Sequence, residues 1–125
     1  MKSFARLFLV DGDNHIYDGI FGIDQIGPDD WVHIFVTQDG LYQRLRAYQG
    51  RNVSLIRVKP GADAVDHRIM SMIGNLVKDE SCGKIYIISQ DRDYYQLIKR
   101  YRQKYGIAAG HLGIAKTIRA AIEKI

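Results

Sequence analysis

The sequence has few of the features that mark secreted or membrane-bound chains. It contains one cysteine and two prolines among 125 residues, which excludes an internal disulfide and a cysteine-rich zinc site. No run approaches the roughly 20 apolar residues of a membrane span. The first apolar run, residues 7–10, is too short for a signal peptide. We therefore expect a cytoplasmic protein with no membrane partner.

The sequence also lacks internal repeats, low-complexity tracts and linkers. Its length suits one domain, residues 1–125, and leaves no room for a second. Hydrophobic residues make up 46% of the chain, which is typical of a globular protein.

Charge is distributed unevenly along the chain, whose formal net charge is +4. Residues 1–30 contain six aspartates and two basic residues, whereas residues 91–125 contain eight lysines or arginines and three acidic residues. An acidic pocket beside a basic surface suits a polyanion that is cut with the help of metal ions. Alternatively, the basic run from 99 to 104 is only the solvated face of a helix.

Apolar runs with strand character alternate with segments of helical periodicity. Strands are predicted at residues 6–10, 31–37, 53–58 and 84–89. Helices are predicted at residues 39–48, 62–78, 91–105 and 114–125, with a weak helix at 15–26 and a loop or short fifth strand at 106–113. This order predicts a three-layer α/β/α fold with a mostly parallel sheet of four to five strands and the first strand near its centre.

Two helical stripes carry alternative interpretations. The tyrosines at 94, 101 and 105 could stack on nucleic-acid bases, but their helical spacing favours a place in the core. The isoleucines at 114, 118, 122 and 125 predict an apolar helix face. That face could pack on the core or on a second copy, so a homodimer stays open.

Three acidic clusters follow the predicted strands. They are Asp11 with Asp13, Asp63 with Asp66, and Asp91 with Asp93. The carboxyl ends of parallel strands meet at one edge of a sheet, so these side chains are expected to converge there. Converging carboxylates repel one another unless cations bridge them, and oxygen ligands select Mg²⁺ or Mn²⁺. The alternative is that each cluster only caps a helix or forms a turn.

Three strings in this order resemble the motifs of NYN-type domains of the PIN-like superfamily. They are FLVDGDN after the first strand, KPGADAVDHRI after the third, and IYIISQDRDYYQLI around the fourth. Together they cover nearly the whole chain, and the third is the most specific. The resemblance implies a divalent-metal-dependent nuclease that acts on RNA, with single-stranded DNA as a further substrate to consider.

The resemblance also implies roles for individual residues. Asp11, Asp63, Asp91 and Asp93 would be the catalytic metal ligands, with Asp66 as the alternative to Asp63 on the helix. Three further residues would support them: Asn14 by hydrogen bonding, Ser89 by orienting the last loop, and Asp13, whose role is open. Basic residues at the rim would contact nucleic acid: Arg57, Lys59, Arg92, Lys99 and Arg100.

Three other functions fit parts of the pattern. A haloacid-dehalogenase-like phosphatase also begins with a strand and Asp-x-Asp, but Asn14 and His15 replace its usual continuation. A catalytically weak PIN-like scaffold would bind RNA or a protein partner without cutting. A receiver domain needs an aspartate at the end of its third strand, where this chain has Val58 and Lys59.

Overall fold

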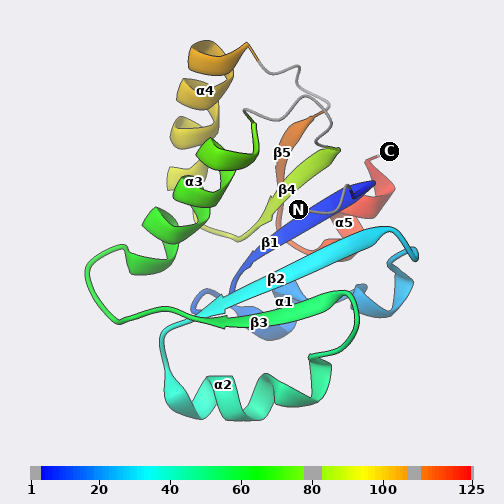
Figure 1. Cartoon of the computed structure of the whole chain (residues 1–125). Helices are drawn as coiled ribbons and strands as arrows, with labels where there is room; N and C mark the ends of the chain where they lie inside the picture. Colours follow the sequence, from blue (N-terminus) through cyan, green and yellow to red (C-terminus); the bar gives the residue numbers. More distant parts are fainter. Residues whose placement is uncertain (1–3, 78–82, 107–110, 125) are drawn as a thin grey trace.

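A five-stranded parallel sheet forms the centre of the molecule. The computed structural model describes residues 4–77, 83–106 and 111–124. The strands lie in the order β3-β2-β1-β4-β5 (Figure 1). Their bounds are β1 Arg6–Asp11, β2 Asp30–Val36, β3 Val53–Arg57, β4 Lys84–Ile88 and β5 Leu112–Ala115. The predicted fold class and the central first strand are confirmed.

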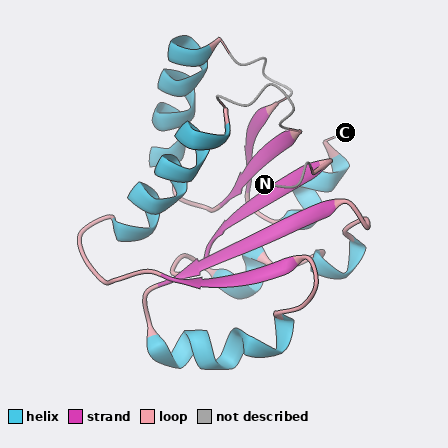
Figure 2. Cartoon of the chain, in the orientation of Figure 1, coloured by secondary structure: helices cyan, strands magenta, loops and turns pink. Residues whose placement is uncertain are grey.

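Helices cover both faces of the sheet, which gives three layers (Figure 2). Helices α3 (Ala64–Leu76) and α4 (Asp93–Tyr105) pack on one face. The other face carries α1 (Ile16–Gly19), α2 (Asp39–Leu45) and α5 (Ile118–Glu123). In β1, Leu7 and Leu9 face the first layer while Phe8 and Val10 face the second. A strand buried on both faces explains the continuous apolar run in the sequence.

The turn after β1 brings its backbone against β2. Gly12 donates a backbone hydrogen bond to the carbonyl of Phe35 at 2.7 Å. A Cβ atom at position 12 would lie only 2.4 Å from that carbonyl oxygen. Only glycine fits this close approach, so the Asp-Gly-Asp turn holds Asp11 at the end of the central strand.

The prediction for the C-terminal segment was partly wrong. Residues 112–115 form β5, and the last helix begins only at Ile118. Ile114 therefore packs on the α3 and α4 face, whereas Ile118 packs on the opposite face. A strand side chain and a helix side chain replace the single stripe that was predicted, and Ile125 lies outside the described residues.

Other helix boundaries also differ from the predictions. The segment 15–26 holds only α1 and a 3₁₀ turn, η1 (Ile23–Gln25), because Gly22 between them has φ 98°. Helix α2 ends at Leu45 and continues as a second 3₁₀ turn, η2 (Arg46–Tyr48). Helix α3 begins at Ala64 rather than 62, and the predicted end at Lys78 lies outside the described residues.

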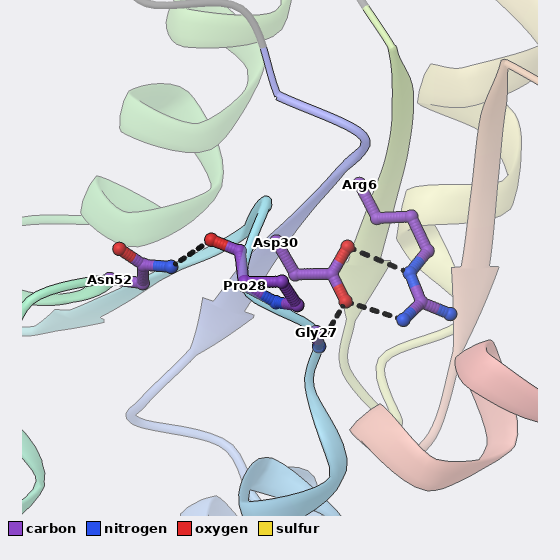
Figure 3. A network of polar contacts seen from close by, with 5 residues as sticks. All are labelled: Arg6, Gly27, Pro28, Asp30 and Asn52. Atoms are coloured by element: carbon purple, nitrogen blue, oxygen red, sulfur yellow. Dashed lines mark hydrogen bonds and ion pairs between the residues drawn. The ribbon is translucent and has the colours of Figure 1, made fainter.

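A polar network stabilises the amino end of the sheet (Figure 3). Arg6 at the start of β1 forms an ion pair with Asp30 at the start of β2, and its Nε donates to Asp30 Oδ1 at 2.9 Å. The backbone nitrogen of Gly27 also donates to Asp30, at 2.7 Å, and Asn52 donates to the carbonyl of Pro28 at 2.8 Å. Hydrogen bonding to Asp30 raises the pKa of Arg6. The buried Asp30 carboxylate is thus fully paired.

In the described part of the chain, no helix is both long enough and apolar enough to cross a membrane.

Candidate active site

The last residue of the central strand, Asp11, is the most buried acid at the carboxyl end of the sheet. Among the described residues, three donors hold its side chain, and all are uncharged. Asp11 Oδ1 accepts from the backbone nitrogen of Asp13 at 3.3 Å. Asp11 Oδ2 accepts from Ser89 Oγ and from Tyr94 Oη, each at 3.3 Å. These bonds fix the carboxylate without neutralising its charge.

Tyr94 connects the central strand with helix α3. Its ring is fully buried in the α3 and α4 layer. Its hydroxyl lies 2.7 Å from Asp66 Oδ1 and 3.3 Å from Asp11 Oδ2, so two carboxylates share one donor. Sequence reasoning assigned Tyr94 to the core and missed its contact with the acids. The available signal was the aromatic position directly after Asp-x-Asp in the third string.

Burial and neighbouring charges raise the pKa values of two of these carboxyl groups. Burial, together with the charge of Asp66, raises the pKa of Asp11 to about 6. Burial raises the pKa of Asp66 as well, and the charges of Asp91, Asp63 and Asp93 raise it further, while the Tyr94 hydrogen bond opposes them. Asp66, the alternative to Asp63 in the sequence, therefore lies among the other acids, and both residues line the pockets.

Two adjoining pockets expose these acids to solvent. The first, about 200 Å³, is lined by Asp11, Asp13, Asn14, Asp63 and Asp66, among others. The second, about 300 Å³, shares Asp63 and Asp66 with the first and is also lined by Asp93, His67 and Arg100, among others. A substrate lying across both pockets would pass directly over the start of α3.

The acidic side chain at the start of α3 is not explained by helix capping. Asp63 occupies the N-cap position but makes no capping hydrogen bond with its side chain. Its φ of 53° lies in the left-handed region, which costs a residue other than glycine free energy. Neither feature stabilises the helix, so the capping interpretation is wrong for Asp63.

The loop after β4 is organised by a relay of short polar contacts. Ser89 Oγ, which donates to Asp11, also accepts from the backbone nitrogen of Asp91 at 3.1 Å. Asp91 Oδ1 accepts from the backbone nitrogen of Asp93 at 2.9 Å, a local bond at the start of α4. The capping interpretation therefore accounts for one of the two carboxylate oxygens of Asp91, Oδ1. Ser89 links this loop to the central strand.

Two residues of the first motif differ in their surroundings. The carboxylate of Asp13 accepts from Thr37 twice, from its backbone nitrogen at 3.1 Å and from its hydroxyl at 2.5 Å. These bonds tie the turn after β1 to the end of β2. Asn14 Oδ1 is buried beside the first pocket and has no hydrogen-bond partner among the described residues. A buried oxygen without a donor is a candidate for contact with a cation or with water.

The donor set fits a hard divalent cation. The candidate ligands are all oxygens, and the pKa values of Asp11 and Asp66 show that each disfavours its charged form in the protein alone. Among the described residues, no three acidic, histidine or cysteine side chains are arranged to hold one metal ion by themselves. Mg²⁺ commonly binds through one or two carboxylates and completes its shell with water and substrate phosphate, so a set of three is not required.

The predicted nucleic-acid contacts lie in different surroundings. Arg100 lines the second pocket. Lys59, Arg92 and Lys99 are exposed. Arg57 forms an ion pair with Asp39, and its guanidinium lies 5.7 Å from the centre of a tyrosine ring. Arg100 is thus a predicted contact that shares a pocket with Asp63, Asp66 and Asp93.

Comparison with known families agrees with this geometry. The family model described as PIN domain matches residues 5–112. The chain belongs to the PIN domain family. PIN domains are generally metal-dependent nucleases, and they use divalent ions such as Mg²⁺ or Mn²⁺. Neither the curated proteins nor the solved structures gave a significant match. In this PIN domain the match begins just before β1 and includes all three acidic clusters.

Proposed function

We propose that this PIN domain is a nuclease of the NYN type that hydrolyses phosphodiester bonds in RNA with Mg²⁺ or Mn²⁺. The observation that carries the proposal is the contact of two carboxylates, the buried Asp11 and the half-buried Asp66, through one tyrosine hydroxyl. Three more acids act on Asp66 through their charge. Such repulsion lowers the stability of the metal-free protein, and a bound cation relieves it.

Each residue would have a distinct role in this reaction. Asp11 and Asp66 would hold the cation, and Asp63, Asp91 and Asp93 would complete its surroundings or orient water. Tyr94 and Ser89 would fix the first two acids through the hydrogen bonds described above. The bound cation would supply activation of water and stabilisation of the charge that develops on the phosphate.

The basic rim supports a polyanionic substrate. Arg100 lines the same pocket as Asp63, Asp66 and Asp93. A phosphate drawn to Arg100 would therefore lie beside the acids. Exposed Lys59 and neighbouring basic residues would add attraction that falls steeply as salt rises.

Two alternatives, a phosphatase and a scaffold that binds RNA without cutting it, agree less well with the surroundings of the acids. The phosphatase pattern uses both acids of Asp-x-Asp, but here the second, Asp13, is engaged by Thr37. A scaffold that binds RNA without cutting would retain the basic rim. It would not explain why carboxylates with raised pKa values are kept together, because their repulsion costs stability.

The decisive experiment is RNA cleavage by Asp91→Asn. Asparagine can still accept the hydrogen bond from the Asp93 backbone, so the fold should remain intact or become more stable. We expect cleavage of single-stranded RNA with Mn²⁺ to fall at least about 100-fold, because asparagine lacks the negative charge. The matched control is Asp24→Asn, the same change at an exposed residue of η1, which should cleave as the wild type does.

The outcomes separate the hypotheses. If Asp91→Asn cuts RNA at the wild-type rate, the acid only caps α4 and its catalytic role is wrong. If the wild type binds RNA but cuts neither RNA nor single-stranded DNA with Mg²⁺ or Mn²⁺, the scaffold alternative holds. EDTA should abolish any cleavage that the proposal explains.

A further inference from the structure

A larger pocket lies along the outer edge of the sheet, beside β5. Its volume is about 550 Å³, which exceeds that of either acidic pocket. Helix α4 contributes Tyr95 and Arg102, α5 is followed by Lys124, and β4 contributes Lys84 and Tyr86. Three cations line this β5-edge pocket, and the described residues lining it include no acid.

Two of the cations are held in place by the backbone of β5. Arg102 Nη2 donates to the carbonyl of Leu112, and Lys124 Nζ donates to the carbonyl of Ile114. These carbonyls point away from β4, because the alternate carbonyls of His111 and Ala115 accept from β4 and from Ser89 just after it. The bonds occupy acceptors that an added strand would use. They also hold both side chains at the pocket through neutral carbonyl oxygens.

Aromatic surface lies beside these cations. Tyr95 is 57% exposed, one of the most exposed large hydrophobic residues described. The ring of Tyr86 lies over Gly113, where an added Cβ would come within 3.0 Å of the ring. Glycine at 113 thus leaves room for that ring in the pocket wall. Fixed cations next to an exposed aromatic ring suit a ligand that carries both a phosphate and a base.

We propose that the β5-edge pocket binds a nucleotide, with its phosphate at Lys84 and Lys124 and its base at Tyr95. The pocket volume lies within the range of sites for small ligands. Helix α4 separates the two sites: Asp93 begins the helix in the acidic region, and Arg102 lies nine residues further along. At about 1.5 Å per residue, that distance is roughly 14 Å.

The same chemistry has two sources, a free mononucleotide or one nucleotide of an RNA strand whose other part lies at the acids. The second source rests on the proposed nuclease function, whereas binding of a free nucleotide does not. Binding is therefore measured in EDTA, where no cleavage occurs. A failure here would leave the Asp91→Asn experiment and its conclusion unaffected.

The test is calorimetric titration of the full chain with adenosine monophosphate, adenosine and inorganic phosphate. Adenosine monophosphate should bind more tightly than either fragment. Lys84→Gln should weaken that binding about tenfold, because a charge-assisted contact to phosphate is lost. Lys84 is the chosen site because its substitution leaves the two β5 edge bonds in place. The matched control, Lys116→Gln, removes the same charge from an exposed residue after β5 that does not line the pocket, and it should bind as the wild type does.

The aromatic contact has its own pair of variants. Tyr95→Ala should weaken the binding of adenosine monophosphate about threefold or more. Tyr95→Phe should bind it as the wild type does, because stacking needs the ring and not the hydroxyl. Tyr17→Ala is the control, since Tyr17 is 56% exposed but lies on α1, outside this pocket.

Titration with an eight-nucleotide RNA identifies the source. If Lys84→Gln weakens RNA binding by about the same factor as it weakens the binding of adenosine monophosphate, the pocket holds part of the strand. If RNA affinity is unchanged and adenosine monophosphate does not compete, the pocket holds a free nucleotide. The proposal is overturned if adenosine monophosphate does not saturate the protein at millimolar concentration, or if Lys84→Gln and Lys116→Gln have equal effects.

Discussion

The two ends of the sheet hold buried aspartates in opposite electrostatic surroundings. At the amino end, Asp30 is 2% exposed and receives an ion pair from Arg6 and a backbone donor from Gly27. At the carboxyl end, Asp11 is 5% exposed, accepts hydrogen bonds from neutral donors in the part of the chain that the structure describes, and lies near the like charge of Asp66. Both acids sit at the ends of adjacent central strands.

The difference separates an acid that is paired within the fold from one that we propose to bind a cation. A buried carboxylate that is paired and hydrogen-bonded contributes to a defined fold, and removing one partner is costly. A buried carboxylate placed against another carboxylate destabilises the protein unless a positive charge lies nearby. At the amino end Arg6 supplies that positive charge to Asp30. At the carboxyl end the proposed cation would supply it to Asp11.

The largest expected effect comes from breaking the paired end. Asp30→Asn removes the charge that compensates Arg6, whose side chain is 19% exposed. We expect the free energy of unfolding to fall by about 3 kcal/mol and Tm by roughly 12 °C, measured by urea and thermal unfolding. The control is Asp29→Asn at the exposed neighbour, which should change stability by less than about 0.5 kcal/mol. A loss below about 1 kcal/mol for Asp30→Asn would contradict the comparison.

The unpaired end should show itself in the pH dependence of stability. The folded-state pKa of Asp11 is about 6 against an ordinary value of 3.8, so the folded state holds its proton more tightly. This stabilisation is complete below the ordinary pKa and is lost as pH rises through about 6. With allowance for solvent screening, we expect the metal-free protein to lose about 2 kcal/mol between pH 4 and pH 8.

The measurement is urea unfolding in EDTA across that range. Asp11→Asn lacks the titrating group and should lose most of the slope near pH 6. Saturating Mn²⁺ should also flatten the slope for the wild type, because a bound cation favours the ionised carboxylate. A slope unchanged by both the substitution and Mn²⁺ would mean that Asp11 does not titrate as inferred.

A smaller effect is expected where one hydroxyl serves two acids. Tyr94→Phe removes the donor shared by Asp11 and Asp66 and should destabilise the metal-free protein by about 1 kcal/mol. The cost should shrink when Mn²⁺ is bound, because a cation then offsets the same repulsion. The matched control is Tyr101→Phe on the same helix, which loses a bond to the carbonyl of Met70 at 3.1 Å. Its cost should be the same with and without Mn²⁺.

The smallest effect is expected for an ion pair that water already solvates. Arg119 and Glu123 are paired at 3.0 Å on the surface of α5, with side chains 48% and 63% exposed. Glu123→Gln should change the free energy of unfolding by less than about 0.5 kcal/mol. If it costs as much as Asp30→Asn, burial is not what separates the two pairs.

Local patterns in the sequence predicted much of the architecture. Continuous apolar runs predicted parallel strands buried on both faces, because each strand needs covering layers on both sides. The order of strands and helices predicted the central place of β1 and the gathering of acids at one edge. The family strings added the PIN-like assignment, which the family match bears out.

Tertiary contacts decided the features that local patterns could not. Ile114 and Ile118 have helical spacing, but pairing of residues 112–115 with β4 makes the first a strand residue and places the two on opposite faces. Asp63 and Asp66 both suit the start of a helix. Only packing of α3 against α4 brings Asp66 to the hydroxyl of Tyr94, 28 residues away.

The sequence by itself determined which residue types could meet at the end of the sheet, because strand direction and side-chain chemistry follow from short segments. Only the tertiary structure decided that Asp30 has an arginine partner while Asp11 has an acid for a neighbour. That choice depends on which side chains, distant along the chain, share one buried space. Burial strengthens attraction and repulsion alike, so a buried aspartate stabilises the amino end of the sheet, whereas a buried aspartate at the carboxyl end costs stability in the protein alone.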